Sequence, residues 1–160
     1  MPSVDSDEPR EGAADDPSRG REEDEGGRPW VVLVVDDNED FRVLLSHMLT
    51  SGRSMLQVVT AQSGEEALAL VPRVRPDAVI TDLMMPRMNG FELCRHLRAD
   101  PITATVPLVM VTANESPESR AEAGRVGVDD YLVKSFDREE LTRRLIALLR
   151  QRRRDVGHVS

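Results

Sequence analysis

Four apolar stretches of the sequence are each followed by residues that could bind an ion or take part in catalysis. These residues are three carboxylates, one hydroxyl and one ammonium: Asp36, Asp37, Asp82, Thr112 and Lys134. If the stretches are parallel strands, their carboxyl ends meet at one edge of a sheet, where open α/β sheets bind ligands. Any one of these residues alone would be typical of a helix cap or a solvated turn. The prediction of a functional site therefore depends on the whole set.

The chemistry that this set predicts is phosphoryl binding with a divalent cation. Clustered carboxylates repel one another and need a compensating positive charge. Mg²⁺ suits them because it takes oxygen ligands and keeps coordination positions for a phosphate. Lys134, the only lysine of the chain, would add a second positive charge. A carboxylate can itself be the nucleophile on phosphorus, and the sequence offers no Ser–His–Asp set.

The stretches that carry these residues alternate with helical patterns. The predicted strands are Val31–Val35, Leu56–Thr60, Ala78–Thr81, Pro107–Val111 and Tyr131–Val133. The predicted helices begin near Phe41, at Ser63 with Glu66 as a capping box, near Phe91, after Ser116 and after Asp137. Such alternation is typical of right-handed crossovers and a parallel sheet with helices on both faces. We therefore expect a single doubly wound α/β domain.

Composition divides the chain of 160 residues into three segments. Residues 1–28 contain ten acidic residues against four arginines, and we expect them to be a disordered acidic tail. Residues 29–149 carry nearly all the large apolar side chains and are the predicted folded domain. Residues 150–160 are basic and are expected to be a tail or an extension of the last helix.

Composition also excludes several classes of protein. The longest apolar run, Trp30–Val35, has six residues, far below the about 20 that a membrane helix needs. The acidic N-terminus does not resemble a secretory signal. The single cysteine, Cys94, forms neither an internal disulfide nor a zinc site, which indicates a core residue of a cytoplasmic protein. The net charge of −8 disfavours direct binding of nucleic acid.

Four motifs together resemble the receiver domain of two-component response regulators. They are Val34-Val35-Asp36-Asp37-Asn38, Asp82-Leu83-Met84-Met85-Pro86-Arg87-Met88-Asn89-Gly90, Val111-Thr112-Ala113 and Asp129-Asp130-Tyr131-Leu132-Val133-Lys134. Asp82, Thr112 and Lys134 follow one another at spacings of 30 and 22 residues. The resemblance covers Val31 to Leu149 and implies a flavodoxin-like (βα)5 domain with a parallel sheet in the order 2-1-3-4-5.

The resemblance implies that Asp82 accepts a phosphoryl group as an acyl phosphate. By the same resemblance, Asp37 and Asp82 would ligate Mg²⁺ directly, the main-chain carbonyl of Met84 would be a third ligand, and Asp36 would act largely through water. The expected cofactor is therefore Mg²⁺.

The resemblance also implies how the phosphoryl group is bound and read. Lys134 would pair with a phosphoryl oxygen. The Thr112 hydroxyl would move onto the phosphoryl group, assisted by the backbone amide of Ala113, and Tyr131 would swing inward into the space released. We expect the helix after Ser116, the Tyr131–Val133 strand and the last helix to form the output surface and a homodimer interface.

The function implied is a cytoplasmic signalling receiver rather than an enzyme. It would take its phosphoryl group from a histidine kinase or a histidine phosphotransfer protein. No output domain is expected after Leu149, so the chain is either a regulator that acts on a downstream protein target or a piece of a longer protein. Two alternatives stay open: a receiver-like interaction module that does not use phosphorylation, and a flavin-binding protein of similar topology, against which the acidic edge argues. Neither nucleic acid nor a membrane is an expected partner.

Two residues depart from the family pattern. Ser135 stands where the family usually has proline after a cis peptide bond. A cis bond before a residue other than proline costs about 2.5–4 kcal/mol, so we expect a trans bond. Met84, two residues after Asp82, cannot orient an attacking water, and Asn114 could do so only modestly. We therefore expect slow self-dephosphorylation.

Overall fold

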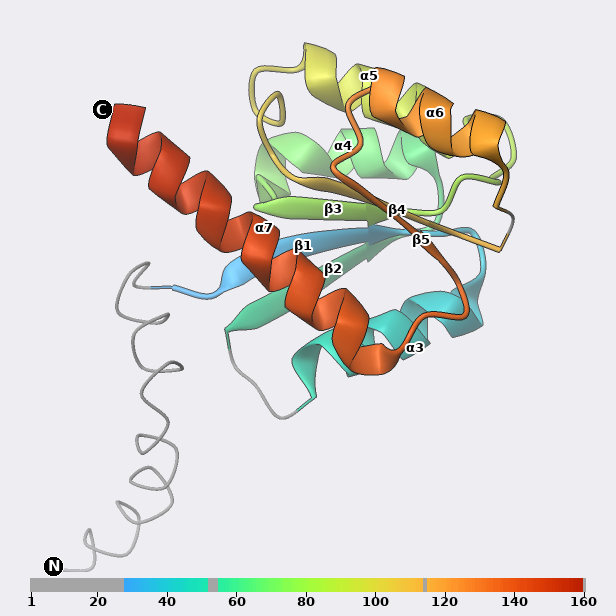
Figure 1. Ribbon diagram of the computed structural model, residues 1–160, viewed down its shortest axis with the longest axis horizontal. Coiled ribbons are helices and arrows are strands. Elements are labelled where there is room, and N and C mark those ends of the chain that lie inside the picture. The colour runs from blue at the N-terminus through green and yellow to red at the C-terminus, as the bar shows by residue number, and fades with distance from the viewer. Residues whose placement is uncertain (1–27, 52–54, 114, 160) are drawn as a thin grey trace, which may run out of the picture.

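The computed structural model describes residues 28–51, 55–113 and 115–159, in which five strands alternate with five helices (Figure 1). The expected disordered tail lies outside the described residues except for Arg28. The strands are β1 (Trp30–Val35), β2 (Leu56–Ala61), β3 (Ala78–Thr81), β4 (Leu108–Thr112) and β5 (Asp130–Val133). The helices are α3 (Glu39–Thr50), α4 (Gly64–Val74), α5 (Gly90–Ala99), α6 (Pro117–Arg125) and α7 (Arg138–Val159).

All neighbouring strands pair in parallel, in the order β2-β1-β3-β4-β5. This confirms the predicted fold class and strand order. In the register of the central pair, Val35 lies opposite Thr81. Asp36 and Asp82, which directly follow these two residues, therefore lie next to each other at the edge of the sheet.

The helices cover the two faces of the sheet because the strand side chains alternate in direction. Helices α3 and α7 lie on one face, and α4, α5 and α6 lie on the other (Figure 1). Along β1, Val32 and Val34 join the core under α3 and α7, whereas Leu33 and Val35 join the core under the other three helices. The strand is thus buried on both faces, which explains its continuous β-branched run.

Two sulfur-containing side chains at the centre of the fold are buried, which confirms the prediction made for Cys94. Cys94 and Met110 are fully buried in the core under α4, α5 and α6. Burial raises the pKa of the Cys94 thiol to about 12. The thiol is therefore a packing group and not a reactive nucleophile in the folded protein.

The start of α4 differs from the predicted capping box. The Ser63 hydroxyl accepts a hydrogen bond from the Glu66 N–H, as expected, but the Glu66 carboxylate accepts from the Gln62 N–H instead of from Ser63. Only one half of the capping box therefore forms. A complete box forms at α5, between Asn89 and Glu92.

The described helices include none with the length and apolar character needed to cross a bilayer. The longest of them, α7, continues beyond Leu149 as far as Val159. Leu141, Leu145 and Leu149 of this helix are buried against the sheet.

Candidate functional site

The end of β1 places one buried and one exposed carboxylate at the edge of the sheet. Asp36 is 2% exposed, whereas Asp37 is exposed. The Asp36 N–H donates to the Ala61 carbonyl of β2 at 3.2 Å, which continues the ladder past the end of the strand. Asp36 Oδ1 accepts from the Asn38 N–H at 2.9 Å. The other carboxylate oxygen, Oδ2, accepts no hydrogen bond from the described residues.

The end of β3 places the third carboxylate beside the first. The Asp82 N–H donates to the Val35 carbonyl at 3.0 Å, and the residue is 7% exposed. Asp82 Oδ1 accepts from the Leu83 N–H at 2.7 Å and more weakly from the Met84 N–H at 3.4 Å. The backbone after β3 thus turns around the carboxylate that the sequence predicts to be the phosphoacceptor.

The end of β5 brings the ammonium to both buried carboxylates. Lys134 Nζ lies 3.1 Å from Asp36 Oδ2 and 3.3 Å from Asp82 Oδ2. The contact with Asp36 is an ion pair without hydrogen-bond geometry, whereas the Asp82 oxygen accepts a hydrogen bond. The Lys134 N–H donates to the Thr112 carbonyl at 2.8 Å, which fixes the backbone of the lysine to the end of β4.

Burial and ion pairing have opposite effects on the pKa values of this site. Burial, and then the negative charge of Asp36, raise the pKa of Asp82 above its ordinary value, although Lys134 opposes the shift. Burial alone would lower the pKa of Lys134, but the two carboxylates outweigh it and hold that pKa above its ordinary value. The lysine is therefore charged at neutral pH, and the site still carries an excess of negative charge.

The three carboxylates fit a divalent cation. Oxygens of Asp36, Asp37 and Asp82 all lie within 4.8 Å of one another. Carboxylate oxygens are the ligands that Mg²⁺ prefers, and a buried oxygen without a hydrogen bond, such as Asp36 Oδ2, gains most from a cation or its water. The donor set and its charge are thus those of a magnesium site.

The remaining predicted residues surround the carboxylates at varying depth. Thr112 is fully buried at the end of β4, and Ala113 after it is exposed. Tyr131 is 5% exposed, with the Arg120 guanidinium 4.7 Å from its ring centroid. The Met84 side chain is 61% exposed. The role predicted for Asn114 falls outside the described residues.

The peptide bond between Lys134 and Ser135 is trans, as expected: the described chain contains no cis peptide bond.

Sequence reasoning missed two neighbours of the site. The Phe41 ring lies 4.2 Å from Lys134 Nζ, and the Arg42 guanidinium donates to the Asp36 carbonyl at 2.7 Å. Both residues lie in a helical pattern, which predicts where Phe41 packs but not that it contacts a cation.

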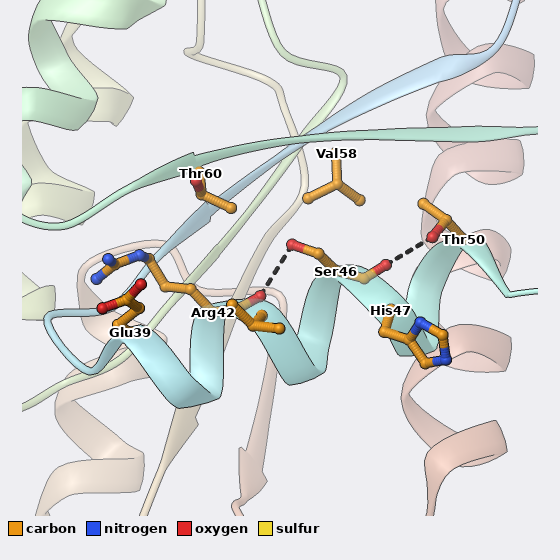
Figure 2. Close-up of a pocket in the computed structure, with 8 residues that line it drawn as sticks. Glu39, Arg42, Ser46, His47, Thr50, Val58 and Thr60 are labelled. Carbon is orange, nitrogen blue, oxygen red and sulfur yellow. Dashed lines mark hydrogen bonds between the residues drawn. The ribbon is translucent and has the colours of Figure 1, made fainter.

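A shallow groove of about 600 Å³ lies between α3 and β2 (Figure 2). Polar side chains line most of it, and the hydroxyls of Ser46 and Thr50 already form hydrogen bonds within the helix. Ser46 donates to the Arg42 carbonyl, and Thr50 donates to the Ser46 carbonyl. The groove does not contain the three clustered carboxylates, which lie at the sheet edge.

Residues 32–146 match the family of the response regulator receiver domain. The chain belongs to this family. The receiver is a signalling domain of two-component systems rather than a classical enzyme, and its CheY-like fold is the one described above. The resemblance seen in the four motifs is thereby confirmed.

Curated relatives match the receiver over part of their length. Response regulator MprA of Mycobacterium sp. (strain KMS) is 42% identical over 129 residues, which are 81% of this chain and 54% of that protein. PhoP of Bacillus subtilis (strain 168), an alkaline phosphatase synthesis transcriptional regulatory protein, is 37% identical over 75% of this chain and 48% of its own length. The chain thus spans about half the length of these relatives.

Solved receiver structures match almost over their full length. The chemotaxis response regulator CheY4 of Vibrio cholerae superimposes with a TM-score of 0.69 at 37% identity, covering 75% of this chain and 98% of CheY4. The receiver domain of the sensor histidine kinase PA1611 from Pseudomonas aeruginosa PAO1 gives a TM-score of 0.68 at 31% identity, covering 76% of this chain and 98% of that chain. That receiver has a magnesium ion coordinated in its active site cleft.

Proposed function

We propose that this receiver accepts a phosphoryl group on Asp82 from a phosphohistidine of a kinase or phosphotransfer protein. A carboxylate oxygen of Asp82 attacks phosphorus, the phosphorus–nitrogen bond breaks, and its electron pair leaves with the donor imidazole. The observation that carries the proposal is the position of Lys134 Nζ, 3.1 Å from Asp36 and 3.3 Å from Asp82. A cation held at two buried carboxylates is suited to the added charge of a phosphoryl group.

Residues of this chain would divide the remaining work. Mg²⁺, held by Asp37, Asp82, the Met84 carbonyl and, through water, Asp36, would neutralise charge on the phosphoryl oxygens. Lys134 would shift from the Asp82 carboxylate to a phosphoryl oxygen.

Thr112 and Ala113 would bind the phosphoryl group from the end of the neighbouring strand β4. The position of β4 supports these two roles. Because β4 pairs with both β3 and β5, its end lies between the proposed phosphoacceptor and the lysine. The Thr112 hydroxyl and the Ala113 amide are the donors, and their movement would alter the packing around Tyr131.

We propose that the output surface comprises α6, β5 and α7. Among the described residues of α6, only Ala123 is buried, so few contacts hold this helix to the sheet. Arg120 of α6 stacks on Tyr131 of β5, and Arg144 of α7 pairs with Asp130 of β5 at 2.9 Å. These contacts link the three elements, and a shift at Tyr131 would change the surface offered to a second copy or a downstream protein.

The kinase or phosphotransfer partner would approach the carboxylate edge. Among the described residues, the large apolar side chains that are exposed are Val43, Leu44 and Met84. Two of them lie on α3, which begins two residues after Asp37, and the third follows Asp82 by two residues. Apolar side chains exposed around a charged centre are suited to contact with a protein.

Incubation with Mg²⁺ and a small phosphodonor such as phosphoramidate tests the proposal by intact mass. The wild type should gain one phosphoryl group, and Asp82→Ala should gain none because the attacking oxygen is gone. Asp40→Ala, which removes an exposed carboxylate from the first turn of α3, should gain one like the wild type. A wild type without any gain would favour the alternative, an interaction module that does not use phosphorylation.

The exposed Met84 side chain is expected to make the acyl phosphate long-lived. In Met84→Asn, an amide beside Asp82 could hold the attacking water by one hydrogen bond, worth on the order of 1 kcal/mol, and dephosphorylation should be about fivefold to tenfold faster. Phosphate release after removal of the donor measures the rate. Met84→Leu should behave like the wild type, and equal rates in all three proteins would contradict this expectation.

A further inference from the structure

The ammonium of Lys134 touches an aromatic face as well as two carboxylates. The Phe41 ring centroid lies 4.2 Å from Lys134 Nζ. Phe41 sits in the first turn of α3, where its N–H donates to the side chain of the cap residue Asn38 at 2.9 Å. Phe136, two residues after the lysine, meets the Phe41 ring edge-on, with centroids 6.5 Å apart and planes at 68°. The cap hydrogen bond thus fixes the backbone of Phe41, and the contact with Phe136 restricts its ring.

Apart from the ring, the two carboxylates hold this ammonium, and Asp82 Oδ2 accepts a hydrogen bond from it at 3.3 Å. Its side chain has four rotatable carbons and is 24% exposed. Ser135 leaves the backbone after it free of the fixed φ that a proline would impose. Asp36 attracts the ammonium without a well-directed hydrogen bond. The carboxylates thus pull the ammonium inward, and the Phe41 ring is a third contact of a different kind.

We propose that Phe41 is a positioning residue for Lys134. The electron-rich face of the ring attracts the cation, so that the ammonium is held between the ring and the oxygens of Asp36 and Asp82. An aliphatic side chain would fill the same space without attracting a charge. The consequence for phosphoryl transfer rests on the proposed function of Asp82, whereas the contact itself does not.

The single lysine of the chain makes the contact measurable. With lysine labelled by ¹³C at the ε carbon, the protein gives one ε-methylene signal, because Lys134 is its only lysine. Protons above an aromatic face are shielded, so the wild-type signal should lie upfield of its position in the unfolded chain. Phe41→Leu should move the signal toward the unfolded position, and Phe41→Tyr should keep it near the wild-type position.

Phe91→Leu is the matched control, because Phe91 packs on the opposite face of the sheet, against the core under α4, α5 and α6. Its lysine signal and phosphorylation rate should equal those of the wild type. Phosphorylation by phosphoramidate should be about fivefold slower in Phe41→Leu and restored in Phe41→Tyr, which retains an aromatic face. Circular dichroism and thermal melting identify any variant that fails to fold. If Phe41→Leu fails, Phe41→Met, which also lacks an aromatic face, takes its place.

Two results would each overturn the positioning role. One is a lysine signal that is the same in Phe41→Leu and the wild type. The other is a phosphorylation rate in Phe41→Leu equal to that of the wild type. Failure of the proposed function has a different signature: no variant, wild type included, gains a phosphoryl group, and the lysine signal alone then decides whether the ring holds the ammonium.

Discussion

Replacement of Lys134 by methionine is expected to lower the free energy of unfolding by about 2–3 kcal/mol. The lysine is the cation that the structure places within 4 Å of the buried carboxylates of Asp36 and Asp82. Methionine keeps the apolar stem but leaves two buried negative charges uncompensated. Full burial would cost about 3–5 kcal/mol, and the partial exposure of the lysine reduces this value. Urea unfolding without Mg²⁺ measures the change.

A second substitution identifies repulsion as the cause. Burial and the charge of Asp36 raise the pKa of Asp82, so ionisation of Asp82 opposes folding at neutral pH. This cost shrinks as the pH falls through the raised pKa toward the ordinary range of an aspartate. Asp82→Asn should therefore recover at least about 1 kcal/mol of what Lys134→Met loses at pH 7, and less near pH 4.

Mg²⁺ provides the independent check of this explanation. A cation bound by the three carboxylates offsets the missing ammonium, so Mg²⁺ should raise the stability of Lys134→Met more than that of the wild type. Lys134→Met should also be phosphorylated much more slowly. If the variant were as stable as the wild type in the absence of Mg²⁺, the lysine would not be the charge that balances the site.

Replacement of Gly90 by alanine is expected to destabilise the fold by about 3 kcal/mol and to impair phosphorylation of Asp82. A Cβ on Gly90 would lie 2.4 Å from the Asp82 carbonyl oxygen and 3.0 Å from Leu83 Cα. Both are backbone atoms, which cannot turn aside as a side chain could. The Gly90 N–H also donates to the Leu83 carbonyl at 2.8 Å, so α5 is bound to the backbone directly after Asp82. Thermal unfolding and intact mass after phosphoramidate treatment measure the two effects.

Gly124→Ala is the matched control, with an effect of opposite sign. Gly124 lies in α6, and a Cβ there would meet no atom within 4 Å. Alanine favours a helix over glycine by up to about 1 kcal/mol, so the variant should be slightly more stable and phosphorylated normally. Similar small effects of both substitutions would contradict the close approach of α5 to Asp82.

Much of the architecture follows from local patterns in the sequence. Continuous β-branched runs predict strands buried on both faces, and recurring apolar residues predict the helices between them. Alternation of the two gives a parallel sheet, whose carboxyl ends meet at one edge. This is why Asp36, Asp82 and Lys134 could be expected together although 98 residues separate the first from the last. The capping box at Ser63 was wrong in its second half because the Glu66 carboxylate bonds one residue further back.

The fold class and the charged residues at the sheet edge could be predicted from the residues themselves, and the strand order from the family resemblance. The way in which those charges are balanced could not be predicted, because it depends on contacts between distant segments. Strand register sets which carboxylates the single ammonium touches, and helix packing sets Phe41 against it. The structure also shows that Gly90 is needed because a side chain at this position would clash with the backbone of Asp82, and not only for a turn. All of these features depend on distances between segments that are far apart in the chain. Hydrophobic periodicity indicates which face of one segment packs on the core, so it does not predict such distances.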